Sequence, residues 1–105
     1  MKRVGFTFRI REDKIEEYVE FHKHVWPEMK EALTRQGWHN YTLFLKPDGT
    51  VFGYFDAAVD LQTASDGMKT EDVNERWQQT MSQFVPDGQK PDDSFVELFE
   101  YFHLD

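Results

Sequence analysis

The 105-residue sequence contains no cysteine, which excludes disulfide bonds and thiol chemistry. Long apolar runs are also missing, and the first ten residues lack the apolar centre and cleavage site of a signal peptide, so we expect a cytoplasmic protein with no membrane partner. Basic residues are few, with 12 Lys and Arg against 20 Asp and Glu and a net charge of −8. Because nucleic-acid binding depends on neutralising phosphates, this charge argues against a nucleic-acid partner.

Several chemical motifs are missing as well. The chain has no glycine-rich phosphate loop and no serine at a nucleophile elbow. His22 and His24 are two residues apart and would point to opposite sides of a helix, and no third ligand follows at a matching spacing. The sequence therefore predicts no metal site.

Aromatic side chains, by contrast, make up 16% of the residues, and ten of them are Phe. So many large side chains in a short chain favour a sheet-based core, or aromatic residues that line a cavity or an interface. The length is that of a single domain, and neither a linker nor an internal repeat divides it. We therefore expect one domain over residues 1–105.

The hydrophobic pattern predicts four strands and two main helical regions. They follow one another as a strand at 4–10, a helix at 13–37, strands at 39–46 and 50–57 joined by a Pro-Asp-Gly turn, a short helical turn within 60–70, a helix at 71–85, a polar loop at 86–94 and a strand at 95–104. This βαββαβ order predicts an α+β, ferredoxin-like fold, with a four-stranded antiparallel sheet and the helices on one face. The strands carry aromatic residues on both sides, so we expect a homodimer in which two sheets pack face to face as a dimeric α/β-barrel.

The first helical region has clear start, break and stop signals. Asp13 is a candidate N-cap, and Glu16, three residues later, completes a capping-box pattern. Pro27 has no N–H and disfavours helical geometry in the residue before it, so we expect one helix to end near Lys23 and a second to start with Pro27 at its first position. Gly37 is the expected cap at the end of the second helix.

The first helix also carries the most informative polar residue. Tyr18, His22 and Trp26 are spaced i, i+4 and i+8, which aligns them on one helical face, whereas His24 points to the opposite face and into solvent. A single His on an apolar stripe is more often a packing residue than a functional one. The helix break at Pro27, one turn further on, could be a simple joint between two helices or could open a pocket beside the imidazole.

Further candidates lie on the second predicted strand and the second main helix. Tyr41 is expected on the strand face that also carries His39, and on its own it would be a sheet aromatic with its hydroxyl at the rim. In the helix at 71–85, Arg76 would usually be a solvated residue and Trp77 a core anchor.

Four segments, in their order and spacing, resemble the L-rhamnose mutarotase family, and the likeness covers nearly the whole chain. They read EEYVEFHKHVWPEM at 16–29, GWHNYTLFL at 37–45, EDVNERWQQTM at 71–81 and ELFEYFHLD at 97–105. The resemblance implies a dimeric α+β enzyme that interconverts the α and β anomers of L-rhamnose without a cofactor. It also implies that His22 is the proton donor and that the sugar-binding residues are Tyr18, Tyr41 and Trp77, with Arg76 beside them.

The implied chemistry suits these residue types. Mutarotation needs a proton delivered to the ring oxygen and one removed from the anomeric hydroxyl, and a His with a pKa near neutrality can act in either direction. Tyrosine hydroxyls and a Trp ring suit the hydroxyls and the C–H surface of a sugar.

Gln78 departs from the family pattern, because many members carry a second Trp at this position. An amide there replaces a flat apolar wall by a donor and an acceptor, which leaves the choice of sugar less defined than the reaction. Three alternatives stay open: a mutarotase for another deoxysugar such as L-fucose, a non-catalytic ligand-binding dimer, and a haem- or quinone-handling monooxygenase on the same fold.

Overall fold

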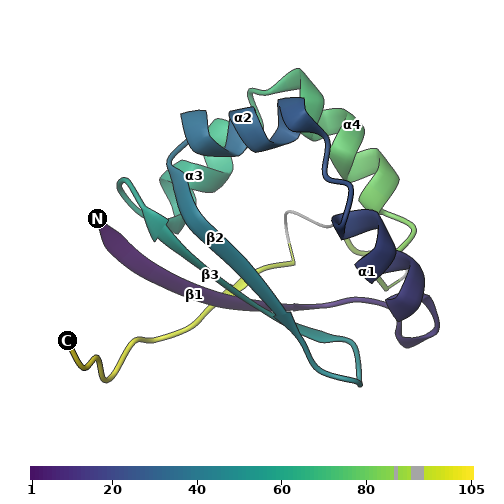
Figure 1. Cartoon of the computed structure of the whole chain (residues 1–105), viewed down its shortest axis with the longest axis horizontal. Helices are drawn as coiled ribbons and strands as arrows, with labels where there is room; N and C mark the ends of the chain where they lie inside the picture. Colours follow the sequence, from purple (N-terminus) through teal and green to yellow (C-terminus); the bar gives the residue numbers. More distant parts are fainter. Residues whose placement is uncertain (87, 91–93) are drawn as a thin grey trace.

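The computed structural model describes residues 1–86, 88–90 and 94–105 of the chain (Figure 1). The elements in chain order are β1 (Lys2–Arg9), the 3-10 turn η1 (Glu12–Lys14), α1 (Ile15–His22), α2 (Pro27–Arg35), β2 (Trp38–Leu45), β3 (Thr50–Ala57), α3 (Leu61–Met68), α4 (Asp72–Met81) and β4 (Val96–Glu97). Positions 87 and 91–93 of the predicted polar loop lie outside the described residues.

The strands form one antiparallel sheet in the order β2-β3-β1-β4. All the helices lie together on one side of this sheet, as Figure 1 shows. This strand order with helices on one face is the ferredoxin-like arrangement, so the predicted α+β fold is confirmed.

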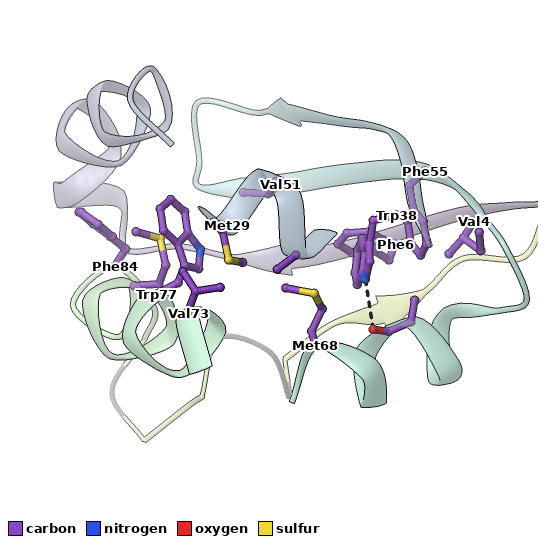
Figure 2. Close-up of a cluster of buried hydrophobic side chains, with 14 of the residues drawn as sticks. Val4, Phe6, Met29, Trp38, Val51, Phe55, Met68, Val73, Trp77 and Phe84 are labelled. Carbon is purple, nitrogen blue, oxygen red and sulfur yellow. Dashed lines mark hydrogen bonds between the residues drawn. The ribbon is translucent and has the colours of Figure 1, made fainter. Parts of the chain in front are cut away.

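The core lies between the sheet and the helix layer, as period-two alternation along the strands requires. Phe6 of β1 and Phe55 of β3 are fully buried, and Trp38, at the start of β2, stacks on the Phe55 ring with 4.1 Å between the ring centroids (Figure 2). The indole Nε1–H of Trp38 donates a 3.1 Å hydrogen bond to the carbonyl of Ala64 on α3. This bond satisfies a buried donor and fixes α3 over the sheet.

Phe6 owes its position to the residue opposite it. In the β1–β3 ladder, Phe6 pairs with Gly53, and the Phe6 ring lies over the Gly53 Cα where any other residue would carry a Cβ. Around this point the ring lies near aromatic side chains of its own strand, of β2 and β3, and of the chain before β4. These partners are Phe8, Trp38, Tyr41, Phe55 and Phe95.

The predicted break in the first helical region is confirmed. α1 ends at His22, and Pro27 occupies the first position of α2 after Trp26, whose backbone is extended at ψ 135°. The predicted capping box is wrong, because Asp13 lies in the 3-10 turn and accepts hydrogen bonds from the Arg11 guanidinium at 2.9 and 3.2 Å. An intramolecular ion pair therefore takes the carboxylate that the cap would need.

The end of α2 and the hairpin follow the sequence signals. Gly37 has φ +87° directly after α2, and Gly49 has φ +93° in the β2–β3 turn, so both adopt the left-handed backbone that favours glycine. The region 60–70 contains more than the predicted single turn, because α3 has eight residues and Asp60 caps it by accepting the N–H of Thr63 at 2.7 Å.

A β-bulge in β2 changes the face on which Tyr41 lies. Between the pairs His39↔Asp56 and Thr42↔Tyr54, β2 has two residues where β3 has one, and Asn40 adopts φ +54°. The extra residue reverses the alternation, so Tyr41 shares the core face with Trp38 rather than with His39. The prediction that Tyr41 and His39 share a strand face is therefore wrong.

The last predicted strand is much shorter than expected. β4 pairs with β1 only at Phe6↔Glu97 and Thr7↔Val96, although the alternating pattern runs over residues 95–104. The chain then continues as an extended tail on the side away from the helices (yellow in Figure 1). Its large apolar side chains are exposed, with Phe99 88% and Tyr101 89% accessible.

Candidate functional site

A cavity of about 600 Å³ lies between the helix layer and the inner face of the sheet. This volume is within the range of roughly 300–1,000 Å³ that is usual for small-molecule sites. The side chains that line it come from β1, β2 and all four α-helices. Four of the predicted site residues are among them, namely Tyr18, His22, Tyr41 and Trp77.

His22 occupies the last position of α1, so its ring projects into the cavity beside the break before Pro27. Its Nδ1 lies 2.9 Å from the backbone carbonyl oxygen of Tyr18. A carbonyl only accepts hydrogen bonds, so Nδ1 must carry the proton, and Nε2 is the lone-pair nitrogen of the neutral ring. Burial lowers the pKa of His22 below its ordinary value, partly opposed by this hydrogen bond. The resting imidazole at neutral pH is thus an acceptor at Nε2.

Aromatic rings fix the orientation of the imidazole. The Tyr18 ring lies 4.3 Å from it between centroids, and the Trp77 indole meets it edge-on at 5.5 Å with an interplanar angle of 86°. Trp77 itself is held by Phe21 and Trp26 at 5.2 and 5.1 Å. Packing between the Tyr18 and Trp77 rings restricts the His22 imidazole to one rotamer, and an acid–base group needs such a fixed position.

The two tyrosines supply hydroxyl groups that stay protonated. Burial raises the pKa of Tyr18 and, together with the nearby Tyr18, that of Tyr41. Both side chains therefore offer neutral donors and acceptors to a ligand in the cavity, and neither is suited to lose its proton near neutral pH.

Arg76 does not join the other predicted site residues. Its guanidinium lies on the exposed side of α4, 3.1 Å from the Glu28 carboxylate and 5.9 Å above the Trp26 ring, and it is not among the described lining residues of the cavity. Trp77, the next residue, points inward because adjacent helical residues differ by about 100° in direction. His24 is exposed, as expected, with its Nε2 3.6 Å from Glu20.

The structure adds cavity residues that the sequence had not singled out. Trp38 lines the cavity beside Tyr41, and Asn74 lines it one turn before Gln78 on α4. The sequence spacing could have indicated Asn74. It lies four residues before Gln78 and three before Trp77, so all three side chains lie near the same face of α4. A polar residue on a core-facing helical stripe is a candidate for a site, since buried polar groups need partners.

Within the described part of the chain, no three His, Asp or Glu side chains gather into a group that could hold a metal ion. No helix formed by those residues is both long enough and apolar enough to cross a membrane.

Fold and site together define the class: a small α+β protein with a histidine ring held at the wall of an aromatic cavity sized for a small molecule. Comparison with known proteins specifies it further. The family model described as L-rhamnose mutarotase matches residues 3–104, and the chain belongs to this family. L-rhamnose mutarotases of Lactiplantibacillus plantarum, Oceanobacillus iheyensis and Bacillus subtilis are 34%, 32% and 32% identical to it, each over 100% of both chains.

Solved structures agree on the fold. The L-rhamnose mutarotase of Formosa agariphila superposes with a TM-score of 0.79 at 24% identity, over 100% of both chains. The tetracenomycin F2 cyclase of Streptomyces glaucescens, a polyketide cyclase, superposes with a TM-score of 0.66 at 15% identity, also over 100% of both chains. At these identities the two structures speak for the fold alone, and the second belongs to an enzyme with a different reaction.

Proposed function

We propose that the protein interconverts the α and β anomers of L-rhamnopyranose and that His22 moves the proton. The observation that carries this proposal is the His22 ring, which is held in one tautomer by the Tyr18 carbonyl and lines a cavity of sugar-compatible size. Membership of the L-rhamnose mutarotase family supplies the substrate.

A single group that takes up and returns the same proton is sufficient for the reaction. Nε2 of neutral His22 takes the proton of the anomeric hydroxyl, the C1–O1 bond becomes a carbonyl, and the bond between C1 and the ring oxygen breaks. The imidazolium then gives the same proton to the departing ring oxygen, which yields the open-chain aldehyde and regenerates neutral His22. Rotation about C1–C2 and the reverse steps give the other anomer, so no net proton is consumed and the chemistry calls for no cofactor.

The surroundings of His22 favour this shuttle over a two-residue scheme. A tyrosine that served as the partner acid or base would have to ionise, and burial opposes ionisation of both Tyr18 and Tyr41. We propose instead that their hydroxyls bind sugar hydroxyls and that the Trp77 ring contacts the C–H surface of the sugar. Arg76 has no part in this scheme, because its guanidinium is engaged outside the cavity.

Nuclear magnetic resonance exchange at the anomeric protons of L-rhamnose tests this function. We expect saturation of one anomer to pass to the other when the enzyme is present, and the catalysed rate to stay level from neutral pH up to about pH 9. The rate should fall as the pH drops through the lowered pKa of His22, with a midpoint below about 6.5, because the imidazolium has no lone pair on Nε2.

The outcome separates the proposal from its competitors. Exchange of L-fucose anomers but not L-rhamnose anomers would assign another deoxysugar, and binding without exchange would indicate a non-catalytic sensor. A rate that declines between pH 6 and 8 as the pH rises would mean that the imidazolium is the resting form required, which would overturn the shuttle.

We also propose a homodimer formed through the outer face of the sheet. Phe44 and Phe52, a cross-strand pair on that face, are 63% and 39% exposed, and the tail after β4 adds exposed Phe99, Tyr101 and Phe102. Apolar groups gathered in this way usually mark a protein interface. A second copy placed face to face would cover both the sheet and the tail, and extra pairing could extend β4.

The double substitution Phe44→Glu and Phe52→Glu should turn the dimer into a monomer, because four added charges would meet across the interface. Light scattering should give twice the 12.6 kDa chain mass for the unchanged protein and the chain mass for the variant. Val19→Glu, on the helix side and 40% exposed, serves as the matched control and should stay dimeric. A monomeric unchanged protein would contradict the proposal.

A further inference from the structure

Two amide side chains form a polar corner in an otherwise mostly aromatic and aliphatic cavity. Asn74 and Gln78 lie one turn apart on α4, and the Gln78 Nε2–H donates to Asn74 Oδ1 at 3.1 Å. Both residues line the cavity. Asn74 is only 4% exposed and is the single polar member of the buried set in the described part of the chain. We refer to Asn74 and Gln78 as the amide pair.

One atom of the amide pair lacks a partner. Gln78 Oε1 has less than 1 Å² of accessible surface, and no described residue donates a hydrogen bond to it. A buried acceptor without a donor is unfavourable, so such an atom in a native cavity calls for an explanation. If the oxygen and nitrogen atoms of both side-chain amides are interchanged, Asn74 donates to Gln78 instead, and a Gln78 N–H is left unsatisfied in place of the oxygen. In either orientation, the amide pair presents one unsatisfied polar atom.

Because Gln78 Oε1 has almost no accessible surface, a ligand reaches it only after the Gln78 side chain rotates toward the cavity. A sugar hydroxyl then satisfies the amide pair, because it both donates and accepts a hydrogen bond and suits either orientation. The neighbouring cavity side chains on α4, Trp77 and Met81, are apolar and suit the C–H surface of a sugar instead. We propose that the amide pair binds one secondary ring hydroxyl of the sugar at C2, C3 or C4, so that Gln78 is a specificity-determining residue and Asn74 a positioning residue. This inference rests on the proposed function.

A hydroxyl-deletion series tests the proposal with the unaltered enzyme. The catalysed exchange rate is measured for L-rhamnose and for its 2-deoxy, 3-deoxy and 4-deoxy analogues, each divided by the spontaneous rate of the same sugar. We expect one analogue to lose roughly tenfold in kcat/KM, chiefly through KM, because the amide pair then keeps its unsatisfied atom.

The variant Gln78→Met identifies the residue responsible, since Met has similar length but forms no comparable hydrogen bond. With L-rhamnose it should lose roughly tenfold in kcat/KM, and with the sensitive analogue less than about twofold, because the interaction is already absent there. Gln79→Met, the same change at the next and exposed position of α4, should behave like the unchanged enzyme with every sugar. A merely structural role for Gln78 would lower activity with all sugars alike.

The two proposals fail differently. If the unchanged enzyme exchanges L-rhamnose anomers but Gln78→Met matches it with all four sugars, the amide pair binds water only and the present inference is overturned. If the unchanged enzyme exchanges no sugar, the proposed function fails. The dissociation constants of the same sugars then test whether the amide pair binds a hydroxyl. Equal constants for the Gln78→Met variant and the unchanged protein would overturn the role of the amide pair as well.

Discussion

Replacing His22 with alanine should lower the catalysed anomer-exchange rate by roughly 10²–10⁴-fold, the usual contribution of a positioned acid–base group. The substitution removes the only nitrogen that our scheme uses to carry the proton between the two oxygen atoms on C1. Binding should change less, because Tyr18, Tyr41 and Trp77 remain in the cavity wall. The measurement is the exchange rate at saturating L-rhamnose, with KM determined separately.

His24→Ala is the matched control for this variant. His24 lies two residues further along the chain, is exposed and contacts only the neighbouring Glu20 among the ion pairs of the described residues. Its removal should leave both kcat and KM within about twofold, as for an ordinary surface substitution. Full activity of His22→Ala, with circular dichroism that matches the unchanged protein, would remove His22 from the mechanism.

Gly53→Ala should destabilise the fold by about 1–3 kcal/mol or more, although it adds only one methyl group. A Cβ at this position would come within 2.7 Å of both Cε atoms of Phe6 and closer still to its Cζ. Phe6 cannot move aside, because it is fully buried and surrounded by five other aromatic rings. Urea unfolding, with the free energy extrapolated to water, measures the loss.

Gly5→Ala provides the same chemical change one ladder position away, on β1 opposite Tyr54. There a Cβ would meet its nearest atoms at 3.9 Å, which is ordinary contact, and a glycine in a strand is entropically unfavourable to begin with. The free energy of unfolding should therefore stay the same or rise by up to about 1 kcal/mol. Equal destabilisation by both substitutions would show that the Phe6–Gly53 contact is not the cause.

The features predicted correctly from sequence depend on neighbours within a few residues. Pro27 removes a donor and restricts Trp26, so the break between α1 and α2 follows from local geometry alone. The Pro-Asp-Gly turn likewise fixes the hairpin through Gly49. The i, i+4 spacing placed Tyr18 and His22 on one face, and the structure brings both to the same cavity.

The features that were mispredicted depend on contacts between distant segments. The bulge at Asn40 inserts one residue against β3, and alternation counted along β2 alone cannot detect it. The tail after β4 has the alternating pattern of a strand but pairs with β1 at only two positions. The sequence also grouped Arg76 with Trp77, and in the structure the helix directs the two side chains to different sides; the part of Arg76 in sugar binding stays a prediction.

The group that orients the His22 ring belongs to the main chain, and this affects how such a site can evolve. A side-chain substitution at position 18 does not remove the backbone carbonyl. The tautomer of the His22 imidazole is therefore retained when the residue that provides this carbonyl is mutated. Under the proposed mechanism, the cavity walls, including Tyr18 itself and the amide pair, can then change one residue at a time while the nitrogen that carries the proton keeps its state. Substrate specificity can therefore change by substitutions in the cavity wall while the proton-transfer chemistry is retained.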